Sequence, residues 1–323
     1  MALSRRSKIL LSLPLVLPAL LVITWFAFTR HVPWKIPPQH QPPASWRVPV
    51  QPGHGLTLRS LGVSGFELTD GTTTVLMDPT PTRPDPVALI TGPIDADPAL
   101  GAKVCPKADV ILVNHAHFDH ALDVGAIAKR TGALVVGSQN TVNLALSRGV
   151  AKERTRVVHS GDRLTVGGFT IDVRASRHTD LVVSQPMSGV ISPGAGALWF
   201  WSYALDDTLA FRLEAAGASV WFHPTSTYAP AELGGLTAKT LIVGVTGEKQ
   251  TKAKVEGLLA ECKATRVLPT HYDNFFQPYE RGLALMPGLD LDPPRQLFLD
   301  ANPKLEWGVL ELGEAIALPP DEE

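Results

Sequence analysis

Three histidines and one aspartate lie within the short stretch from His115 to His120. Their spacing is His-x-His-x-Asp-His, and side chains two residues apart in an extended loop point the same way. His115 and His117 can therefore bind one metal ion. Asp119 and His120 must point elsewhere, which suits a second ion nearby. Imidazole and carboxylate ligands without thiolate favour zinc, iron or manganese.

The position of this motif argues against a histidine-rich surface loop without function. An apolar run from Ala108 to Val113 precedes it and is typical of a buried strand. A helix-like segment from Ala121 to Lys129 follows. Loops at the ends of strands are where α/β sheets usually bind their ligands.

Further histidines follow other predicted strands. A third ligand for the first ion is missing from the motif, and His178 and His159 compete for that role. His159 leads into a Ser-Gly-Asp turn between strands, so we predict that His178 is the ligand. His223 and His271 also follow apolar strands and are candidate ligands.

Two residues beside these positions could assist the chemistry. Asp78 ends a predicted strand and is either a turn-former or a carboxylate that orients a metal-bound histidine. Tyr272 is next to His271, and we predict a catalytic role for it as a proton donor to a leaving group.

Three aromatic residues alternate at Trp199, Trp201 and Tyr203. On a strand they would share one face. They either pack against the core or form an aromatic wall of the substrate pocket, over an apolar substrate.

The composition excludes some functions. The chain has 323 residues, of which 45% are hydrophobic, and a net charge of −2. No basic block occurs beyond the first residues, which argues against nucleic acid as the main partner. Cys105 and Cys262 are too few for a disulfide scaffold, and they are either buried thiols or one bridge.

The N-terminus predicts a membrane segment. After Arg5, Arg6 and Lys8, residues 9–29 carry no charge. As a helix this run would span about 31 Å, the thickness of a bilayer core. A cleaved signal peptide is the alternative, but no Ala-x-Ala site follows, so an uncleaved single-pass anchor is favoured. Either interpretation places the remaining chain outside the cytoplasm, in the periplasm of a Gram-negative cell.

The composition changes along the chain divide it into four parts. We predict an anchor over 1–32, a stiff proline-rich linker over 33–50, a catalytic domain over 51–312 and an acidic tail over 313–323. His40 in the linker is expected to be solvated. Alternating or continuous apolar runs predict strands at 56–61, 65–68, 73–77, 108–113, 132–137, 157–158, 163–166, 169–173, 208–213, 219–222, 241–245 and 266–269.

Taken together, these residues resemble the metallo-β-lactamase superfamily from about Leu56 to Leu310. The likeness is greatest to the branch of L-ascorbate-6-phosphate lactonases and N-acyl-phosphatidylethanolamine phospholipases D. The resemblance implies an α/β fold, a four-layer αββα sandwich. It also implies that one ion is held by His115, His117 and His178 and another by Asp119, His120 and His271.

The sequence departs from that family at His223. There the family has an aspartate that bridges both metals, whereas a neutral imidazole gives one lone pair to one ion. Without this carboxylate, less negative charge offsets the positive charge of the second ion. We therefore expect one tight zinc and one weaker ion, with iron or manganese as alternatives.

The function that these features predict is metal-dependent hydrolysis. A metal-bound hydroxide would attack an ester, lactone or phosphodiester in a small-molecule or lipid-like substrate, and Asp119 would steer it. A non-catalytic metal-binding or partner-docking protein is the alternative, and oxygen chemistry at a di-iron site is a third. The sequence does not determine the oligomeric state.

Overall fold

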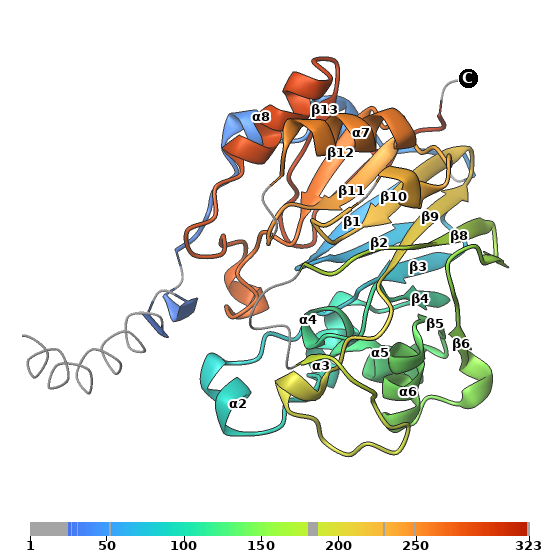
Figure 1. Cartoon of the computed structure of the whole chain (residues 1–323), viewed down its shortest axis with the longest axis vertical. Helices are drawn as coiled ribbons and strands as arrows, with labels where there is room; N and C mark the ends of the chain where they lie inside the picture. The colour runs from blue at the N-terminus through green and yellow to red at the C-terminus, as the bar shows by residue number, and fades with distance from the viewer. Residues whose placement is uncertain are drawn as a thin grey trace, which may run out of the picture.

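Two packed β-sheets form the body of the molecule, with helices on both outer sides (Figure 1). The computed structural model describes residues 25–321 except 27, 31, 52, 180–186, 229 and 248–249. Within these residues each sheet has seven strands, in the orders β14-β1-β2-β3-β4-β5-β6 and β13-β12-β11-β10-β9-β8-β7. The predicted four-layer αββα architecture is confirmed.

The strands are short and buried. The first sheet contains β1 (Leu56–Gly62), β2 (Gly65–Thr69), β3 (Thr74–Met77), β4 (Val110–Leu112), β5 (Leu134–Gly137), β6 (Thr155–Val157) and β14 (Ala315–Leu318). The second contains β7 (Arg163–Val166), β8 (Phe169–Ala175), β9 (Leu209–Ala215), β10 (Ala218–His223), β11 (Thr240–Gly244), β12 (Arg266–Thr270) and β13 (Glu306–Trp307).

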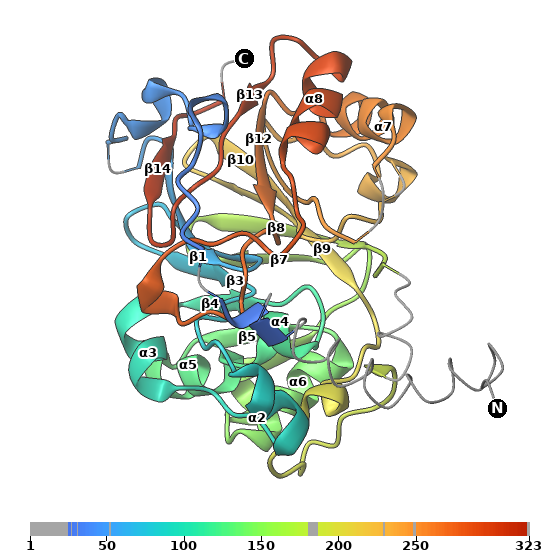
Figure 2. The same ribbon diagram turned by 90° about the vertical axis from the view of Figure 1, so that its left-hand side faces the viewer.

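The helices cover the outer face of each sheet (Figure 2). On the first sheet lie α2 (Pro86–Thr91), α3 (Pro98–Val104), α4 (Phe118–Ala121), α5 (Val124–Thr131) and α6 (Gln139–Ser147). On the second lie α7 (Lys252–Cys262) and α8 (Asp292–Ala301). Short 3-10 helices occur at Pro38–His40, Ala44–Arg47, Lys152–Arg154, Phe200–Ser202, Pro230–Leu233 and Tyr279–Arg281.

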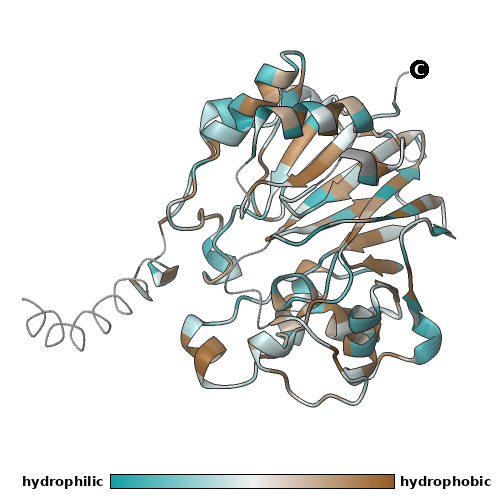
Figure 3. Cartoon of the chain, in the orientation of Figure 1, coloured by the Kyte–Doolittle hydropathy of each residue, from teal (hydrophilic) through white to brown (hydrophobic). Residues whose placement is uncertain are grey.

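Central strands are apolar on both faces because each face is covered. On β4, Val110 and Leu112 pack between the two sheets, and Ile111 packs under the helices of the first sheet. Successive strand side chains point to opposite faces, so a strand buried on both sides is a continuous apolar run. Figure 3 shows such hydrophobic residues along the strands of both sheets.

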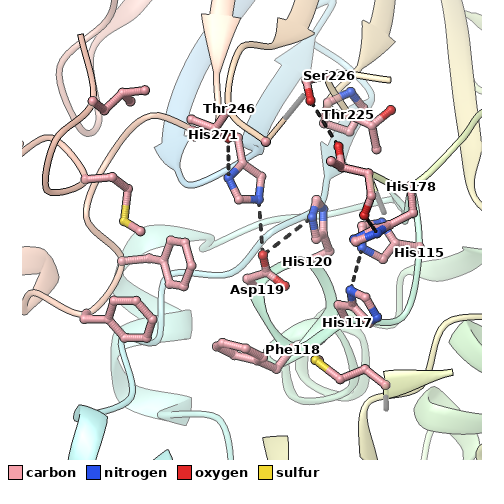
Figure 4. Close-up of a pocket in the computed structure, with 18 of the residues that line it drawn as sticks. His115, His117, Phe118, Asp119, His120, His178, Thr225, Ser226, Thr246 and His271 are labelled. Atoms are coloured by element: carbon pink, nitrogen blue, oxygen red, sulfur yellow. Dashed lines mark hydrogen bonds and ion pairs between the residues drawn. The ribbon is translucent and has the colours of Figure 1, made fainter. Parts of the chain in front are cut away.

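Strand direction determines where the loops gather. Strands β3, β4 and β5 run parallel, and so do β10, β11 and β12. The carboxyl ends of parallel strands lie at one edge of a sheet, and ligands bind there. The loops after β4, β8 and β12, which carry the predicted metal ligands, therefore come together at the edge of the sandwich (Figure 4).

The predicted strand over Trp199, Trp201 and Tyr203 is wrong. Trp199 precedes the 3-10 helix Phe200–Ser202, and the rings of Trp199 and Trp201 stack at 4.7 Å. Tyr203 is fully buried under the first sheet's helices. A 3-10 helix does not alternate its side chains between two faces as a strand does, so Trp201 is 41% exposed whereas Tyr203 is buried.

The proline and glycine content of residues 80–107 predicts a long loop, but this stretch contains helices α2 and α3. Asp85 and Asp97 each cap a helix that begins at a proline, and both carboxylates accept backbone N–H bonds. Proline is favoured at the first helical position, where its missing N–H costs nothing. An Asp-Pro pair is therefore a helix start here rather than a turn.

The segment 33–50 is docked against the domain and is not a free spacer. Trp46 is 1% exposed, and its Nε1–H donates to Glu306 at 2.9 Å. His40 is buried too, contrary to expectation. Its Nδ1 accepts from Trp307 at 3.1 Å, so its Nε2–H donates to Asp292 at 2.9 Å.

The predicted acidic tail contains an edge strand. Strand β14 pairs antiparallel with β1, with Leu318 opposite Leu56 and Ile316 opposite Leu58. Ile316 and Leu318 are buried between the sheets. Their alternation stabilises the strand in spite of the acidic residues that follow.

Most of the predicted membrane run, 9–29, lies outside the described residues. Among the residues that the structure describes, no helix has the length and apolar character needed to cross a membrane. Cys105 and Cys262 are both buried free thiols.

One buried ion pair connects three loops below the edge where the ligands gather. Arg83 Nη2 lies 2.9 Å from Asp273 Oδ2, and the two side chains are 3% and 5% exposed. The other oxygen of Asp273 accepts from the backbone N–H of Val63 at 2.7 Å. The loop after β3 is thereby joined to the β1–β2 turn and to the loop after β12.

We expect Arg83→Met to destabilise the protein by about 3–5 kcal/mol, because it leaves the Asp273 carboxylate buried without its cation. Urea unfolding followed by circular dichroism measures this loss. Arg47→Met is the matched control, since Arg47 is half exposed and pairs with Glu314 at the surface. Its cost should be below about 1 kcal/mol. Equal losses in the two variants would contradict the role of the buried pair.

Candidate metal centre

Three histidines from two sheets form the first ligand group. His115 and His117 come from the loop after β4, and His178 comes from the segment after β8. One ring nitrogen of each lies within 4.8 Å of the others. The predicted partnership of His178 with the motif is therefore present in the geometry (Figure 4). His159, the competing residue, has a side chain that is 70% exposed.

Hydrogen bonds orient two of these rings. His115 Nδ1 bonds to the side-chain oxygen of Asn114, and His178 Nδ1 bonds to the carbonyl oxygen of Thr179 at 2.8 Å. Both acceptors are oxygens, so Nδ1 carries the proton in each ring. The lone pair is then on Nε2, which for His115 lies 3.1 Å from His117 Nδ1.

A second group contains the only carboxylate among the described cavity-lining residues. Asp119 lies 3.1 Å from His271 Nε2 and 3.8 Å from His120 Nε2. The three ligand atoms are again within 4.8 Å of one another. His271 comes from the loop after β12, so this group also joins both sheets.

Asp78 lies behind the second group and holds His120. It is completely buried, and its Oδ2 lies 2.6 Å from His120 Nδ1. Its Oδ1 accepts from the backbone N–H of Asn114 at 2.7 Å. A carboxylate on Nδ1 fixes the tautomer and directs the Nε2 lone pair into the site. The geometry therefore matches the orienting role, one of the two alternatives for Asp78.

The two groups adjoin. The rings of His115 and His120 are 4.0 Å apart, centroid to centroid. Both groups line a single cavity of about 620 Å³ (Figure 4). Two ions held there would be close enough to act on one substrate group.

Burial lowers the pKa of the histidines in the first group, whereas for His120 the carboxylates of Asp78 and Asp119 outweigh burial and raise the pKa. Burial lowers the pKa of His117 to about 4, and it lowers the pKa values of His115 and His178 below the ordinary value. These three rings are therefore neutral at pH 7, with lone pairs available. Burial raises the pKa of Asp119, but His120 and His271 outweigh this effect and lower that pKa, so the carboxylate is ionised.

The backbone around the site is strained. His271, Asp78 and Val63 have φ angles of +63°, +43° and +54°, a region that is uncommon for residues other than glycine and most unfavourable for the β-branched Val63. The N–H of His271 donates to the carbonyl of Val63 at 2.9 Å, and Asp273 holds the N–H of Val63. Such strain persists only where surrounding contacts impose it, typically at functional sites.

His223 does not join either ligand group, which corrects its assignment as a metal ligand. It is the last residue of β10 and is fully buried beside Tyr228. Its Nδ1 lies 3.2 Å from the carbonyl of Thr225, and its Nε2 lies 3.2 Å from the hydroxyl of Ser176. Both nitrogens are thus occupied, and burial lowers its pKa, so the ring is a neutral structural element.

Tyr272 and the three alternating aromatics are also outside the site. The hydroxyl of Tyr272 donates to the carbonyl of Leu310 at 2.9 Å in the core under α7 and α8. Burial raises its pKa well above the ordinary value, which does not suit a proton donor at neutral pH. Trp199, Trp201 and Tyr203 are not among the described residues that line the cavity.

Other residues form the cavity wall in their place. The apolar side contains Phe28, Met187, Phe275, Phe276 and Met286, and the loops after β10 and β11 add hydroxyl groups. Phe275 and Phe276 follow His271 closely in the sequence, which is the one signal that could have indicated them. Nothing in the sequence places Phe28 near the motif.

The donor set fits divalent metal ions. Five imidazoles and one carboxylate converge, no thiolate is among them, and the histidines of the first group are held neutral. Such ligands suit zinc, iron or manganese, and a carboxylate that holds the far ring nitrogen of a ligand histidine, as Asp78 holds His120, is typical of metal sites. The chemistry of the donors does not select one of these metals.

Comparison with known proteins agrees with the fold. A metal-dependent hydrolase from Anaeromyxobacter sp. strain K is 24% identical over 261 residues, which cover 77% of this chain and 81% of the relative. Among solved structures, the metallo-hydrolase Igni18 from Ignicoccus hospitalis has a TM-score of 0.56 at 17% identity, over 83% of this chain and 99% of that one. CmlA from Streptomyces venezuelae, a diiron β-hydroxylase, has a TM-score of 0.51 at 14% identity, over 84% and 55%.

The family model of the β-lactamase superfamily domain matches residues 73–272, more than half of the chain. This range includes both ligand groups and ends just after His271. The chain therefore belongs to the β-lactamase superfamily, as a hydrolase of the metallo-β-lactamase fold.

Proposed function

We propose that this protein is a metal-dependent hydrolase that acts on an ester, a lactone or a phosphodiester. The observation that carries the proposal is the pair of adjoining ligand groups, each within 4.8 Å, at the wall of one cavity. The likeness to the lactonase and phospholipase D branch remains a prediction from the sequence motifs.

Metal ions bound here would lower the pKa of water toward about 7 and make hydroxide available at neutral pH. His115, His117 and His178 would hold one ion, and Asp119, His120 and His271 the other. Asp119 is the group placed to accept a hydrogen bond from the attacking water, because it is ionised and faces the cavity. Asp78 keeps His120 oriented throughout.

The cavity offers little negative charge to two dications. Asp119 is the one carboxylate among the described lining residues, since His223 is turned away and hydrogen-bonded elsewhere. The described lining residues thus include no second carboxylate that could bridge two ions and add its negative charge. We therefore propose one tightly bound ion, zinc or else iron or manganese, at the three histidines, and a weaker second ion.

The N-terminal run 9–29 supports a further proposal, that the chain is held at a membrane. Its length and lack of charge match a bilayer core. The last residues of the run reach the cavity, because Phe28 is among the residues that line it. Fractionation of cells that express the full chain, with and without residues 1–24, tests this placement.

We expect metal analysis to find one ion per chain that survives dialysis and a second that is lost. The reason is that Asp119 is the one carboxylate among the described lining residues that offsets the charge of two dications. Inductively coupled plasma mass spectrometry after dialysis against a weak chelator measures both. Two ions retained equally would contradict the proposal.

We expect Asp119→Ala to lower hydrolysis by about a hundredfold or more while the protein stays folded, because it removes a ligand and the ionised group beside the water. Rates on a panel of aryl esters, lactones and phosphodiesters measure this, with circular dichroism as the check on folding. Asp207→Ala is the control, since that carboxylate is largely exposed, and it should leave the rate unchanged.

Two results would contradict the proposed hydrolase function. A metal-loaded protein that binds ions but hydrolyses nothing on the panel would favour a metal-binding or docking role. Iron in both sites with oxygen consumption would favour oxidative chemistry.

A further inference from the structure

The cavity beside the metal centre is lined by hydroxyl groups and by many apolar side chains. The hydroxyls of Thr225, Ser226 and Thr246 lie on the side of the second sheet (Figure 4). The apolar part of the lining comprises Phe28, Phe118, Met187, Phe275, Phe276, Met286, Pro287 and Leu289. A substrate that enters therefore meets the ligand groups at one end and a largely apolar surface beside them.

Four of these residues form a continuous aromatic row. The rings of Phe118 and Phe275 are 6.1 Å apart, those of Phe275 and Phe276 4.6 Å, and those of Phe276 and Phe28 5.4 Å. The row begins at the metal centre, because Phe118 lies between His117 and Asp119 in the sequence. Phe275 also contacts the ring of His271 at 5.9 Å.

The far end of the row is held in place by polar contacts. The side-chain amides of Asn274 and Gln277 both donate to the carbonyl oxygen of Phe28. Phe28 is thus fastened to the same loop that carries Phe275 and Phe276. An apolar surface maintained by such contacts at a cavity is suited to binding rather than to filling the core.

Few of the described side chains that line the cavity are charged. Among the described residues that line the cavity there is no lysine or arginine, and Asp119 is the one acidic residue. A carboxylate, phosphate or sulfate on the substrate, away from the metals, would find no cationic side chain among these described residues. Burial of an unpaired charge is strongly unfavourable, because the charge loses its hydration without gaining a partner.

We propose that the substrate carries an apolar chain or ring system next to its scissile group and no charged group elsewhere. The chemistry of the scissile group rests on the proposed function. The apolar character of the rest of the substrate rests on the aromatic row alone. Phe275 and Phe276 determine specificity for the chain length. Substrates with a phosphate or another ionic group remote from the reacting bond are excluded.

Ligand displacement tests this proposal without catalysis. The full chain, free of metal, is equilibrated with the uncharged fluorophore N-phenyl-1-naphthylamine, which is then displaced by hexanol, octanol and decanol. Each added methylene that is buried should tighten displacement by about fourfold. Decanediol bis-phosphate, with a charge at both ends, should displace at least tenfold more weakly than decanol. The absence of a chain-length effect, or preference for the bis-phosphate, would overturn the proposal.

Alanine substitutions test where the apolar ligand binds. Phe276→Ala should weaken fluorophore binding by about tenfold, because it opens a gap in the row without touching a metal ligand. Trp201→Ala is the matched aromatic control, since Trp201 is 41% exposed and is not one of the described residues that line the cavity. It should leave binding unchanged. Equal effects in the two variants would contradict the assignment.

The outcome separates the two proposals. If binding depends on chain length but no ester, lactone or phosphodiester is hydrolysed, the proposed apolar binding site is supported and the proposed hydrolase function is contradicted. Displacement by decanol in phosphatidylcholine vesicles, compared with decanol in solution, then distinguishes a membrane source of the ligand from a dissolved one.

Discussion

The metal centre exists only where the two sheets meet. The loop after β4 and helix α4 supply four candidate ligands, and each group needs one more from the other sheet, His178 or His271. Packing between the sheets, through residues such as Leu112, Phe211 and Leu268, therefore holds the ligands together before any ion binds. Core stability and metal affinity are consequently coupled, because separating the sheets separates the ligands.

The second constraint is the orientation of rings that could otherwise rotate. Asp78 and Asn114 hold His120 and His115 from behind, so that each directs a lone pair into the cavity. The strained turns at Val63 and His271 belong to the same arrangement, since Asp273 and Arg83 hold them in place. The site depends on buried charge away from the ligands as much as on the ligands themselves.

Short-range sequence patterns predicted most of the strands of the fold. Strands buried on both faces are recognisable as apolar runs, and the motif at His115–His120 marked the strand end where the site lies. The failures have physical causes. Asp-Pro pairs that begin α2 and α3 are typical of turns as well, and β14 follows a glycine within an acidic terminus. The alternation of aromatic residues from Trp199 to Tyr203 is a strand pattern, but the segment forms a 3-10 helix.

The sequence by itself determined which residue types could bind metal, and it paired them by their spacing and by family resemblance. Only the tertiary structure decided which side chains face the cavity. His223 ends a strand as His271 follows one, yet its ring is bound by Ser176 and Thr225, whereas that of His271 reaches Asp119. A ring's direction depends on contacts with residues distant in sequence, which local patterns do not encode. For the same reason the aromatic row, with Phe28 far from Phe276 in the chain, emerges only when the chain is folded.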